Sequence, residues 1–222
     1  MYRNLSSEAQ PRLKLLPYAR YAGASPSDPL RFYYWPVLGA MYRRRVELCL
    51  AELRGGERVL EVGFGSGATF LNLHDRYREI HGVDLTASVE AVKAVFESIQ
   101  VETHLQNGDV LDIAYADGFF DAVLLVSILE HLRPEQLRPA FQEICRVLKP
   151  GGQVVYGVPV ERPLMVSMFR LLGYDIRKYH FSTEKDVSAA AGSVLEMVRL
   201  VQMQGIPPMF GRVYEVGHLV KR

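Results

Sequence analysis

The segment 59–70 constrains the fold of this chain more than any other stretch. An apolar run ending at Val62 leads into three glycines spaced two residues apart, and a helix is expected to start near Ala68. The glycines are Gly63, Gly65 and Gly67. Glycine allows a tight turn and a close approach of the backbone to a ligand. A buried strand, a glycine turn and a helix in this order are typical of the first unit of an open α/β sheet.

The rest of the chain continues the alternation of strands and helices. Strands are expected at 58–62, 80–83, 102–105, 120–126, 153–158, 195–203 and 212–220, and helices at 36–53, from 68, 87–99, 135–148 and 187–191. Such alternation predicts a parallel sheet. The run 120–126 is almost continuously apolar, as in a central strand covered on both faces. The last two strands, separated by Gly205-Ile206-Pro207-Pro208, predict an antiparallel hairpin at the sheet edge.

Length and charge predict one domain with a basic N-terminal segment. With 222 residues, of which 49% are hydrophobic, the chain can bury one core but is too short for a cofactor domain plus a full substrate domain. Residues 1–54 hold nine Lys and Arg against four Asp and Glu, and are interrupted by prolines. We expect them to form a basic, aromatic cap, and residues 55–222 to form the globular domain.

Several classes of protein are disfavoured by composition. A net charge of +1 argues against nucleic acid as the main partner. No apolar run is long enough for a membrane span, and the N-terminus does not look like a signal peptide, so an intracellular, cytoplasmic protein is expected. Cys49 and Cys145 lie far apart without metal-ligand spacing, so we expect no metal and two buried, reduced thiols.

A second acid, Asp84, follows the glycines by roughly twenty residues and stands at the end of the second expected strand. This is the arrangement that binds the ribose of a nucleoside cofactor in the crevice beyond the strand ends. The glycine pattern does not by itself name the cofactor, because Gly63, Gly65 and Ala68 also satisfy a relaxed dinucleotide fingerprint. A sulfonium nucleoside carries a cation instead of a pyrophosphate, and Glu61 beside the glycines suits that cation.

The chain resembles the class I S-adenosylmethionine-dependent methyltransferases, most closely the small-molecule branch (methyltransferase type 11) that includes quinone-biosynthesis and sterol-type enzymes. Four stretches carry the resemblance, in the family's order and spacing: VLEVGFGSG at 59–67, GVDL at 82–85, the segment 107–132, and LKPGGQVVYGVP at 148–159. They cover about residues 55–160. The resemblance implies a Rossmann-like, doubly wound, mostly parallel seven-stranded sheet with an antiparallel C-terminal edge strand.

The resemblance also implies a set of residues that bind S-adenosylmethionine, released as S-adenosylhomocysteine. They are Glu61, Gly63, Gly65, Gly67, Asp84, Leu85, Asp109, Val110 and Ser127. Asp84 can accept hydrogen bonds from both ribose hydroxyls, and Leu85 is expected on the adenine face. Asp109 is expected to bind the adenine amino group, unless it belongs only to an Asn-Gly-Asp turn. Val110 is expected to pack on the adenine ring, and Ser127 to lend its backbone to the cofactor amino group.

The acceptor side is less defined by the sequence. His131 is a candidate general base, or a residue that only shapes the loop. Tyr33, Tyr34 and Met168 are candidates for the acceptor pocket, with ordinary core packing as the alternative. Methyl transfer needs in-line placement and exclusion of water more than a base. An Asn-Pro-Pro-Tyr type motif is absent after the fourth expected strand, which disfavours methylation of nucleic-acid amino groups or protein glutamine.

The sequence therefore predicts methyl transfer to an oxygen or carbon atom of a small, partly apolar acceptor. Three alternatives stay open. One is a membrane-peripheral enzyme acting on a lipid or quinone, with the basic N-terminal segment on an anionic surface. Another is an NAD-dependent oxidoreductase, which the Asp109 region and the lack of a substrate domain disfavour. The third is a catalytically silent fold that keeps the cofactor pocket. The oligomeric state is left open.

Overall fold

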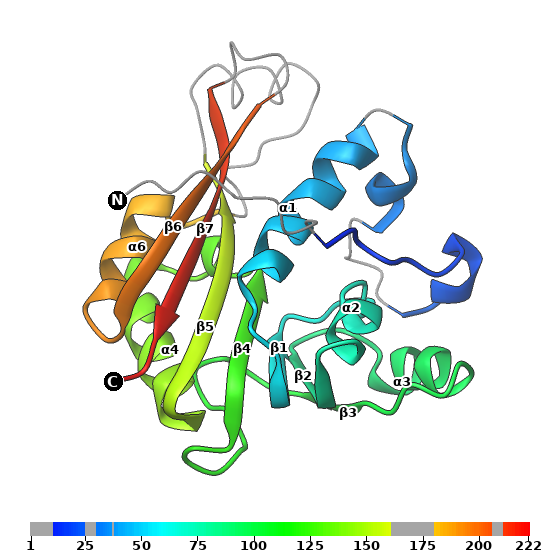
Figure 1. Ribbon diagram of the computed structural model, residues 1–222, viewed down its shortest axis with the longest axis horizontal. Helices are drawn as coiled ribbons and strands as arrows, with labels where there is room; N and C mark the ends of the chain where they lie inside the picture. Colours follow the sequence, from blue (N-terminus) through cyan, green and yellow to red (C-terminus); the bar gives the residue numbers. More distant parts are fainter. Residues whose placement is uncertain (1–10, 25–29, 37, 161–179, 206–210) are drawn as a thin grey trace.

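The protein is built on one seven-stranded sheet (Figure 1). The computed structural model describes residues 11–24, 30–36, 38–160, 180–205 and 211–222. The strands are β1 (Gly56–Val62), β2 (Tyr77–Asp84), β3 (His104–Asn107), β4 (Phe120–Val126), β5 (Leu148–Pro159), β6 (Glu196–Gln204) and β7 (Arg212–Val220). Their order in the sheet is β3-β2-β1-β4-β5-β7-β6. The predicted doubly wound, mostly parallel sheet is confirmed.

The first five strands are parallel, and β7 runs antiparallel to both β5 and β6. The C-terminal hairpin is therefore present as predicted, but its antiparallel member β7 lies inside the sheet and β6 forms the edge. The sequence explains this order. Most of β7 is buried, whereas β6 alternates exposed and half-buried residues and carries Glu196, Arg199 and Gln202. Polar side chains suit an edge strand because they discourage pairing with another chain.

Helices cover both faces of the sheet. They are η1 (Tyr18–Tyr21), η2 (Leu30–Tyr34), α1 (Leu38–Glu52), α2 (Phe70–His74), α3 (Val89–Glu97), η3 (Leu129–His131), α4 (Pro134–Val147) and α6 (Glu184–Gly192). One core cluster joins α1, α2 and α3 to the sheet face that carries Val59 and Ile80. The other joins α4 and α6 to the face that carries Leu60 and Val123. Figure 1 shows these two groups of helices on either side of the sheet.

Some element boundaries differ from the sequence predictions. β3 begins at His104, two residues later than expected, because its register pairs 104–107 with the last four residues of β2. The segment 149–152, expected as a turn before the next strand, lies inside β5 as an irregular start. There the pairing with β4 jumps from Phe120↔Leu148 to Ala122↔Gln153. α4 thus passes directly into β5.

The N-terminal segment shares the core of the domain. Leu13, Tyr21 and Leu30 belong to the same cluster as the α2 and α3 side chains. The side chain of Asn72 on α2 binds this segment twice, accepting from the Lys14 amide and donating to the carbonyl oxygen of residue 12, each at 2.9 Å. The division of the chain at residues 54 and 55 stays a prediction.

The two cysteines differ from each other. Both are free thiols, and Cys49 is fully buried as expected. Burial raises the pKa of the Cys49 thiol, against the opposing effect of the Arg45 charge. The expectation that Cys145 is buried is wrong: it is half-buried, because Ile144 beside it on α4 takes the inward-facing position. None of the described helices is long and apolar enough to cross a membrane.

Candidate functional site at the carboxyl edge of the sheet

The carboxyl ends of four parallel strands bring the predicted cofactor residues to one edge. The ends of β1 and β2 pair through Val62↔Val83, and the ends of β2 and β3 pair through Asp84↔Asn107. β4 ends beside β1, one residue before Ser127. The glycine loop, Asp84 and the turn after β3 therefore lie at the edge where open α/β sheets bind ligands.

The glycine loop owes its residue types partly to packing. All three predicted glycines have positive φ, between 52° and 72°. A Cβ atom at Gly63 would overlap the side chain of Ile128, and one at Gly67 would lie 2.7 Å from the rings of Phe70 and Phe96. Side chains are strongly disfavoured at both positions for this reason alone. The predicted contact of the glycines with a cofactor stays a prediction.

Asp84 ties the second strand to the glycine loop. Its Oδ2 atom accepts a hydrogen bond from the Gly65 amide at 2.9 Å. Its Oδ1 atom accepts from the amides of Thr86 and Ala87, each at 2.8 Å. The following helix α3 begins at Val89 and is capped by Ser88, so Asp84 is not its N-cap. Asp84 thus joins the glycine loop to the turn that follows β2.

Glu61 and Leu85 occupy opposite environments. Glu61, on β1, is only 3% exposed, and its carboxylate accepts a hydrogen bond from the Thr69 hydroxyl at the start of α2. A buried carboxylate needs such polar partners. Leu85, in contrast, is 68% exposed just beyond β2. An apolar side chain so exposed at the strand ends is available to a flat ligand.

The turn after β3 combines a structural role with the predicted binding role. The Asn107 side-chain amide donates to the carbonyl oxygens of Asp84 (3.1 Å) and Ala87 (3.0 Å), which joins this turn to the end of β2. Asp109 accepts from the Leu111 amide at 3.0 Å through Oδ1, as in an ordinary aspartate turn. Val110 is 5% exposed and belongs to the core, so little of its surface is open to a ring.

Ser127 has a strained backbone that two long-range contacts hold. Its φ is 57°, a left-handed conformation unusual for a residue with a side chain. Its amide donates to the Gly157 carbonyl oxygen at 2.8 Å, and its hydroxyl lies 2.9 Å from the hydroxyl of Tyr214 on β7. Of the backbone groups of Ser127, only the carbonyl oxygen can accept a hydrogen bond from a cofactor ammonium. Sequence reasoning did not find Tyr214.

The fold places a second histidine beside His131. His131 ends η3 and is exposed, and its ring centroid lies 5.1 Å from that of His180 at an interplanar angle of 73°. Glu130, beside His131 in the chain, is 3% exposed. Sequence reasoning assigned no role to His180. It lies three residues before Thr183, the N-cap of α6.

The predicted acceptor residues are only partly brought to this edge. Tyr33 is buried in η2 and packs against Tyr42 at 5.9 Å, whereas Tyr34 is 36% exposed and donates its hydroxyl to the Leu16 carbonyl oxygen. The N-terminal segment does reach the edge, because the Ser88 amide donates to the carbonyl oxygen of residue 24 at 3.0 Å. Met168 lies outside the described residues.

The electrostatics of this edge suit a nucleoside with a cation. Three acids, Glu61, Asp84 and Asp109, stand at the ends of β1, β2 and beyond β3. The helix after the glycine loop, α2, has five residues, so the dipole that would face a pyrophosphate is small. Two shallow hollows, of about 210 and 180 Å³, border the opposite edge, near Val101 and near Lys149, and take no part in this site.

Comparison with known proteins gives a family match over the centre of the chain. Residues 59–152 match the family model described as a methyltransferase domain. Ajmaline N-methyltransferase of Rauvolfia serpentina is 26% identical over 195 residues, which are 78% of this chain and 66% of that protein. Ubiquinone biosynthesis O-methyltransferase of Alkalilimnicola ehrlichii is 31% identical over 130 residues, 58% of this chain and 51% of that protein.

The chain thus spans about half to two thirds of the length of these two relatives. A solved structure of geranyl diphosphate methyltransferase in complex with S-adenosylmethionine superposes with a TM-score of 0.68 at 16% identity, covering 95% of this chain and 97% of that one. At this identity the superposition shows the shared fold.

Proposed function

Because residues 59–152 carry a domain of the class I S-adenosylmethionine-dependent methyltransferase family, we propose that this protein transfers a methyl group from S-adenosylmethionine to a small, partly apolar acceptor. The observation that supports this most directly is the bond between Asp84 and the Gly65 amide. It joins the two loops that hold the ribose and the methionine part of the cofactor in this fold. The proposed acceptor atom is an oxygen or a carbon. A nitrogen atom is a further candidate, because one of the relatives is an N-methyltransferase.

In this proposal the chain's own groups bind and orient the cofactor, which supplies an activated methyl group on a sulfonium. Asp84 already accepts three backbone hydrogen bonds, and a carboxylate offers about four acceptor sites. One ribose hydroxyl therefore binds Oδ2 directly, and a second requires the Gly65 amide to move away. Glu61 and the Ser127 carbonyl oxygen face the cationic methionine part.

The adenine ring is proposed to lie over Leu85, with its amino group donating to Asp109. Leu85 offers exposed apolar surface, and Asp109 keeps one carboxylate oxygen beyond its bond to Leu111. The small exposed area of Val110 limits its part to the edge of the ring. His131, exposed beyond β4, is the proposed base that takes the acceptor proton.

The nicotinamide alternative is less well supported. An edge with three acids and a five-residue helix after the glycine loop is a poor match to a pyrophosphate, whose binding needs amides and a helix dipole directed at it. The relatives reported above are also methyltransferases.

Calorimetric titration with S-adenosylmethionine, S-adenosylhomocysteine and NAD tests the cofactor. We expect binding of the first two, weakened about tenfold or more by Asp84→Asn, since a charged hydrogen bond contributes about 1.5–3 kcal/mol. Asp75→Asn, which removes an exposed acid far from the site, should bind like the parent protein. Binding of NAD alone, or equal affinities for both variants, would contradict the proposal.

The alternative of a catalytically silent fold predicts that the protein binds the cofactor but transfers no methyl group. Formation of S-adenosylhomocysteine in the presence of a panel of phenols, enols and amines would establish transfer. Tight cofactor binding with no product across the panel would favour a binding or scaffolding role.

A specific observation favours membrane contact as a second candidate property. Three of the exposed large hydrophobic side chains, Tyr18, Tyr34 and Trp35, lie in the N-terminal segment together with Arg20 and Arg31. Aromatic and basic groups together suit an anionic lipid surface, at about 1 kcal/mol for each basic residue near it. Binding to phosphatidylserine vesicles should weaken with salt and with the double variant Arg20→Glu, Arg31→Glu. Vesicle binding that changes neither with salt nor in the double variant would contradict this candidate property.

A further inference from the structure

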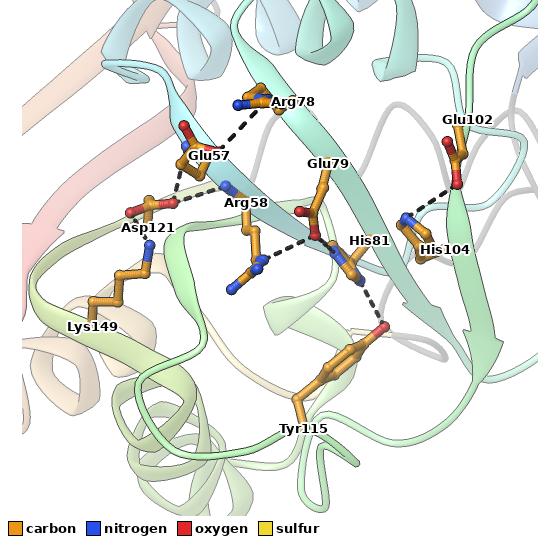
Figure 2. A network of polar contacts seen from close by, with 10 residues as sticks. All are labelled: Glu57, Arg58, Arg78, Glu79, His81, Glu102, His104, Tyr115, Asp121 and Lys149. Carbon is orange, nitrogen blue, oxygen red and sulfur yellow. Dashed lines mark hydrogen bonds and ion pairs between the residues drawn. The ribbon is translucent and has the colours of Figure 1, made fainter.

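Two arginine side chains that pack on aromatic rings differ in how their charge is satisfied. Arg58, at the amino edge of the sheet, has its Cζ atom 4.4 Å from the centroid of the Phe119 ring, and its Nε atom lies 2.9 Å from the Glu79 carboxylate (Figure 2). Arg45, on α1, also packs on rings, but its Nε atom is buried and has no hydrogen-bond partner among the described residues. A buried donor of this kind calls for an explanation, and a bound ligand is one.

Two tyrosine rings hold the Arg45 guanidinium. Its Cζ atom lies 3.9 Å from the centroid of the Tyr42 ring and 5.3 Å from that of the Tyr214 ring. Such contacts stabilise the positive charge through the faces of the rings. They offer no acceptor oxygen to the five N–H donors of a guanidinium. Arg45 itself is half-buried, so part of its side chain stays open to a ligand.

The course of α1 places Arg45 at the cofactor edge of the sheet. The end of α1 lies near the start of β1, and its first turns lie toward the carboxyl ends of the strands (Figure 1). Cys49 packs over Gly157 of β5, where an added Cβ atom would lie 2.6 Å from both the Cys49 Sγ atom and the Tyr214 hydroxyl. Arg45 is one helical turn before Cys49, further toward this edge. Tyr214 thus stands between Arg45 and Ser127, whose hydroxyl it contacts at 2.9 Å.

The charge of Arg45 acts on the buried groups below this edge. Burial raises the pKa of the Cys49 thiol, and Arg45 is the strongest of the effects that oppose this rise. Burial also holds the pKa of Tyr214 well above its usual range, again against the charge of Arg45. Glu61 raises the first of these pKa values further, and Glu130 raises the second. Because acids surround the arginine, an anion bound here depends on direct contact with the guanidinium and not on a general positive potential.

We propose that Arg45 binds a carboxylate group of the methyl acceptor. The planar fork of donors on a guanidinium matches the two oxygens of a carboxylate. The rings of Tyr42 and Phe32, whose centroids lie 5.1 Å apart, continue from Arg45 and suit the apolar part of such an acceptor. The carboxylate anchors the acceptor, and another of its atoms takes the methyl group. This inference rests on the proposed methyltransferase function and narrows the acceptor class to acids with an apolar body.

Ligand-observed NMR titration with benzoate, phenylacetate and cinnamate, each beside its carboxamide, tests the site in the free protein and with S-adenosylhomocysteine. We expect the acids to bind at least about tenfold more tightly than the amides, because only the acids form a charge-assisted pair with the guanidinium. Arg45→Gln should abolish this difference. Arg45→Lys should keep part of it, since lysine keeps the charge but loses the fork. Arg44→Gln, the same change about 100° around the helix, should keep all of it.

Equal affinities for acids and amides in the parent protein would overturn the site, as would an unchanged difference in Arg45→Gln. Thermal unfolding of each variant shows whether it is folded, and the Arg45→Lys result decides if Arg45→Gln is not. Formation of S-adenosylhomocysteine tests the acceptor class. Hydroxylated acids should lose kcat/KM in Arg45→Gln, mainly through a higher KM. Product formed from neutral acceptors alone, at a rate that Arg45→Gln leaves unchanged, would contradict this class.

Calorimetry with S-adenosylhomocysteine separates the two proposals. Binding of acids that depends on Arg45, in a protein that does not bind S-adenosylhomocysteine, means that the proposed function fails and the anion site holds. Binding of S-adenosylhomocysteine without any preference for acids means that the anion site fails.

Discussion

At the scale of single residues, Ser127 shows how the edge is held in an unfavourable conformation. A left-handed backbone costs a residue with a side chain of the order of 1–2 kcal/mol. The Gly157 carbonyl oxygen and the Tyr214 hydroxyl hold Ser127 in place from two other strands. Burial is the main reason why the pKa of Tyr214 lies well above its usual range, so its hydroxyl stays protonated. Strain of this kind persists where neighbours over-determine it.

Tyr214→Phe removes the hydroxyl group that contacts Ser127 and keeps the aromatic ring. We expect a loss of about 1 kcal/mol in the free energy of unfolding, the usual contribution of one hydrogen bond. We also expect weaker binding of S-adenosylhomocysteine, measured by calorimetry, because Ser127 becomes free to leave its left-handed conformation. Tyr77→Phe is the control: it removes a 3.2 Å bond to Gln153 near the other edge and should change stability but not cofactor affinity.

The predicted cofactor residues and the missed ones differ in how far apart their contacts lie in the sequence. Asp84 and the glycines were predictable because each follows its own strand at a standard spacing, and parallel strands end at one edge. The partnerships Ser127–Tyr214 and His131–His180 were not. They depend on the register of β7 and on the hydrogen bonds that Ser182 donates to the carbonyl oxygens of Glu130 and Leu132, and a single sequence shows neither.

At the scale of elements, the amino edge of the sheet is held by one carboxylate (Figure 2). Asp121 at the start of β4 accepts from the amides of Glu57 and Arg58 on β1, at 3.1 and 2.8 Å, and from Lys149 on β5 at 2.6 Å. Burial opposes ionisation of Asp121, but these donors outweigh it and hold its pKa below the usual value.

Asp121→Ala should therefore lower the free energy of unfolding by about 1–3 kcal/mol, because strand amides lose their acceptor. Denaturant unfolding measures this. Asp117→Ala, whose side chain is 79% exposed, should cost less than about 1 kcal/mol. Similar losses in both variants would mean that the contacts of Asp121 add little.

The burial of His81 on β2 leads us to expect that the stability of the protein depends on pH. Burial, and then the nearby charge of His104, lower the pKa of His81 against the opposing effect of its hydrogen bond to the Glu79 carboxylate. In the unfolded chain the pKa is about 6.5, so below that pH the unfolded state binds more protons and stability falls as pH decreases. The urea midpoint should drop between pH 8 and 5.5, and it should drop less in His81→Gln. An equal drop in both proteins would assign the effect to other groups.

Elements with a strong pattern were predictable almost to the residue. β4 has the predicted bounds of 120–126, because an almost continuous apolar run has to be buried as a whole, on both faces of the sheet. α2 is short and begins at Phe70, since the glycine loop takes the residues before it. The start of β5 could not be predicted, because the Pro-Gly-Gly sequence reads as a turn and only pairing with β4 and β7 makes it part of a strand.

At the scale of the whole molecule, Asn72 connects the N-terminal segment to the domain. It is 5% exposed, and its amide binds the backbone of Arg12 and Lys14. Asn72→Ala should cost about 2 kcal/mol, for two hydrogen bonds, and should speed proteolysis within 11–24. Lys14→Ala removes only the exposed ion pair with Asp75 and should cost less than about 1 kcal/mol. Unchanged proteolysis in Asn72→Ala would show that the other contacts of the segment hold it without Asn72.

Because β7 lies between β5 and β6, the strands cannot join the sheet in the order in which they are synthesised. β6 leaves the ribosome before β7, yet it has no place in the sheet until β7 has bound β5. A nascent chain stopped before Arg212 thus exposes the edge of β5 and a polar, unpaired strand. Long-range pairing of this kind is slow and open to aggregation. Protection of the unpaired β5 edge until β7 is available is therefore the expected task of a chaperone that assists this protein.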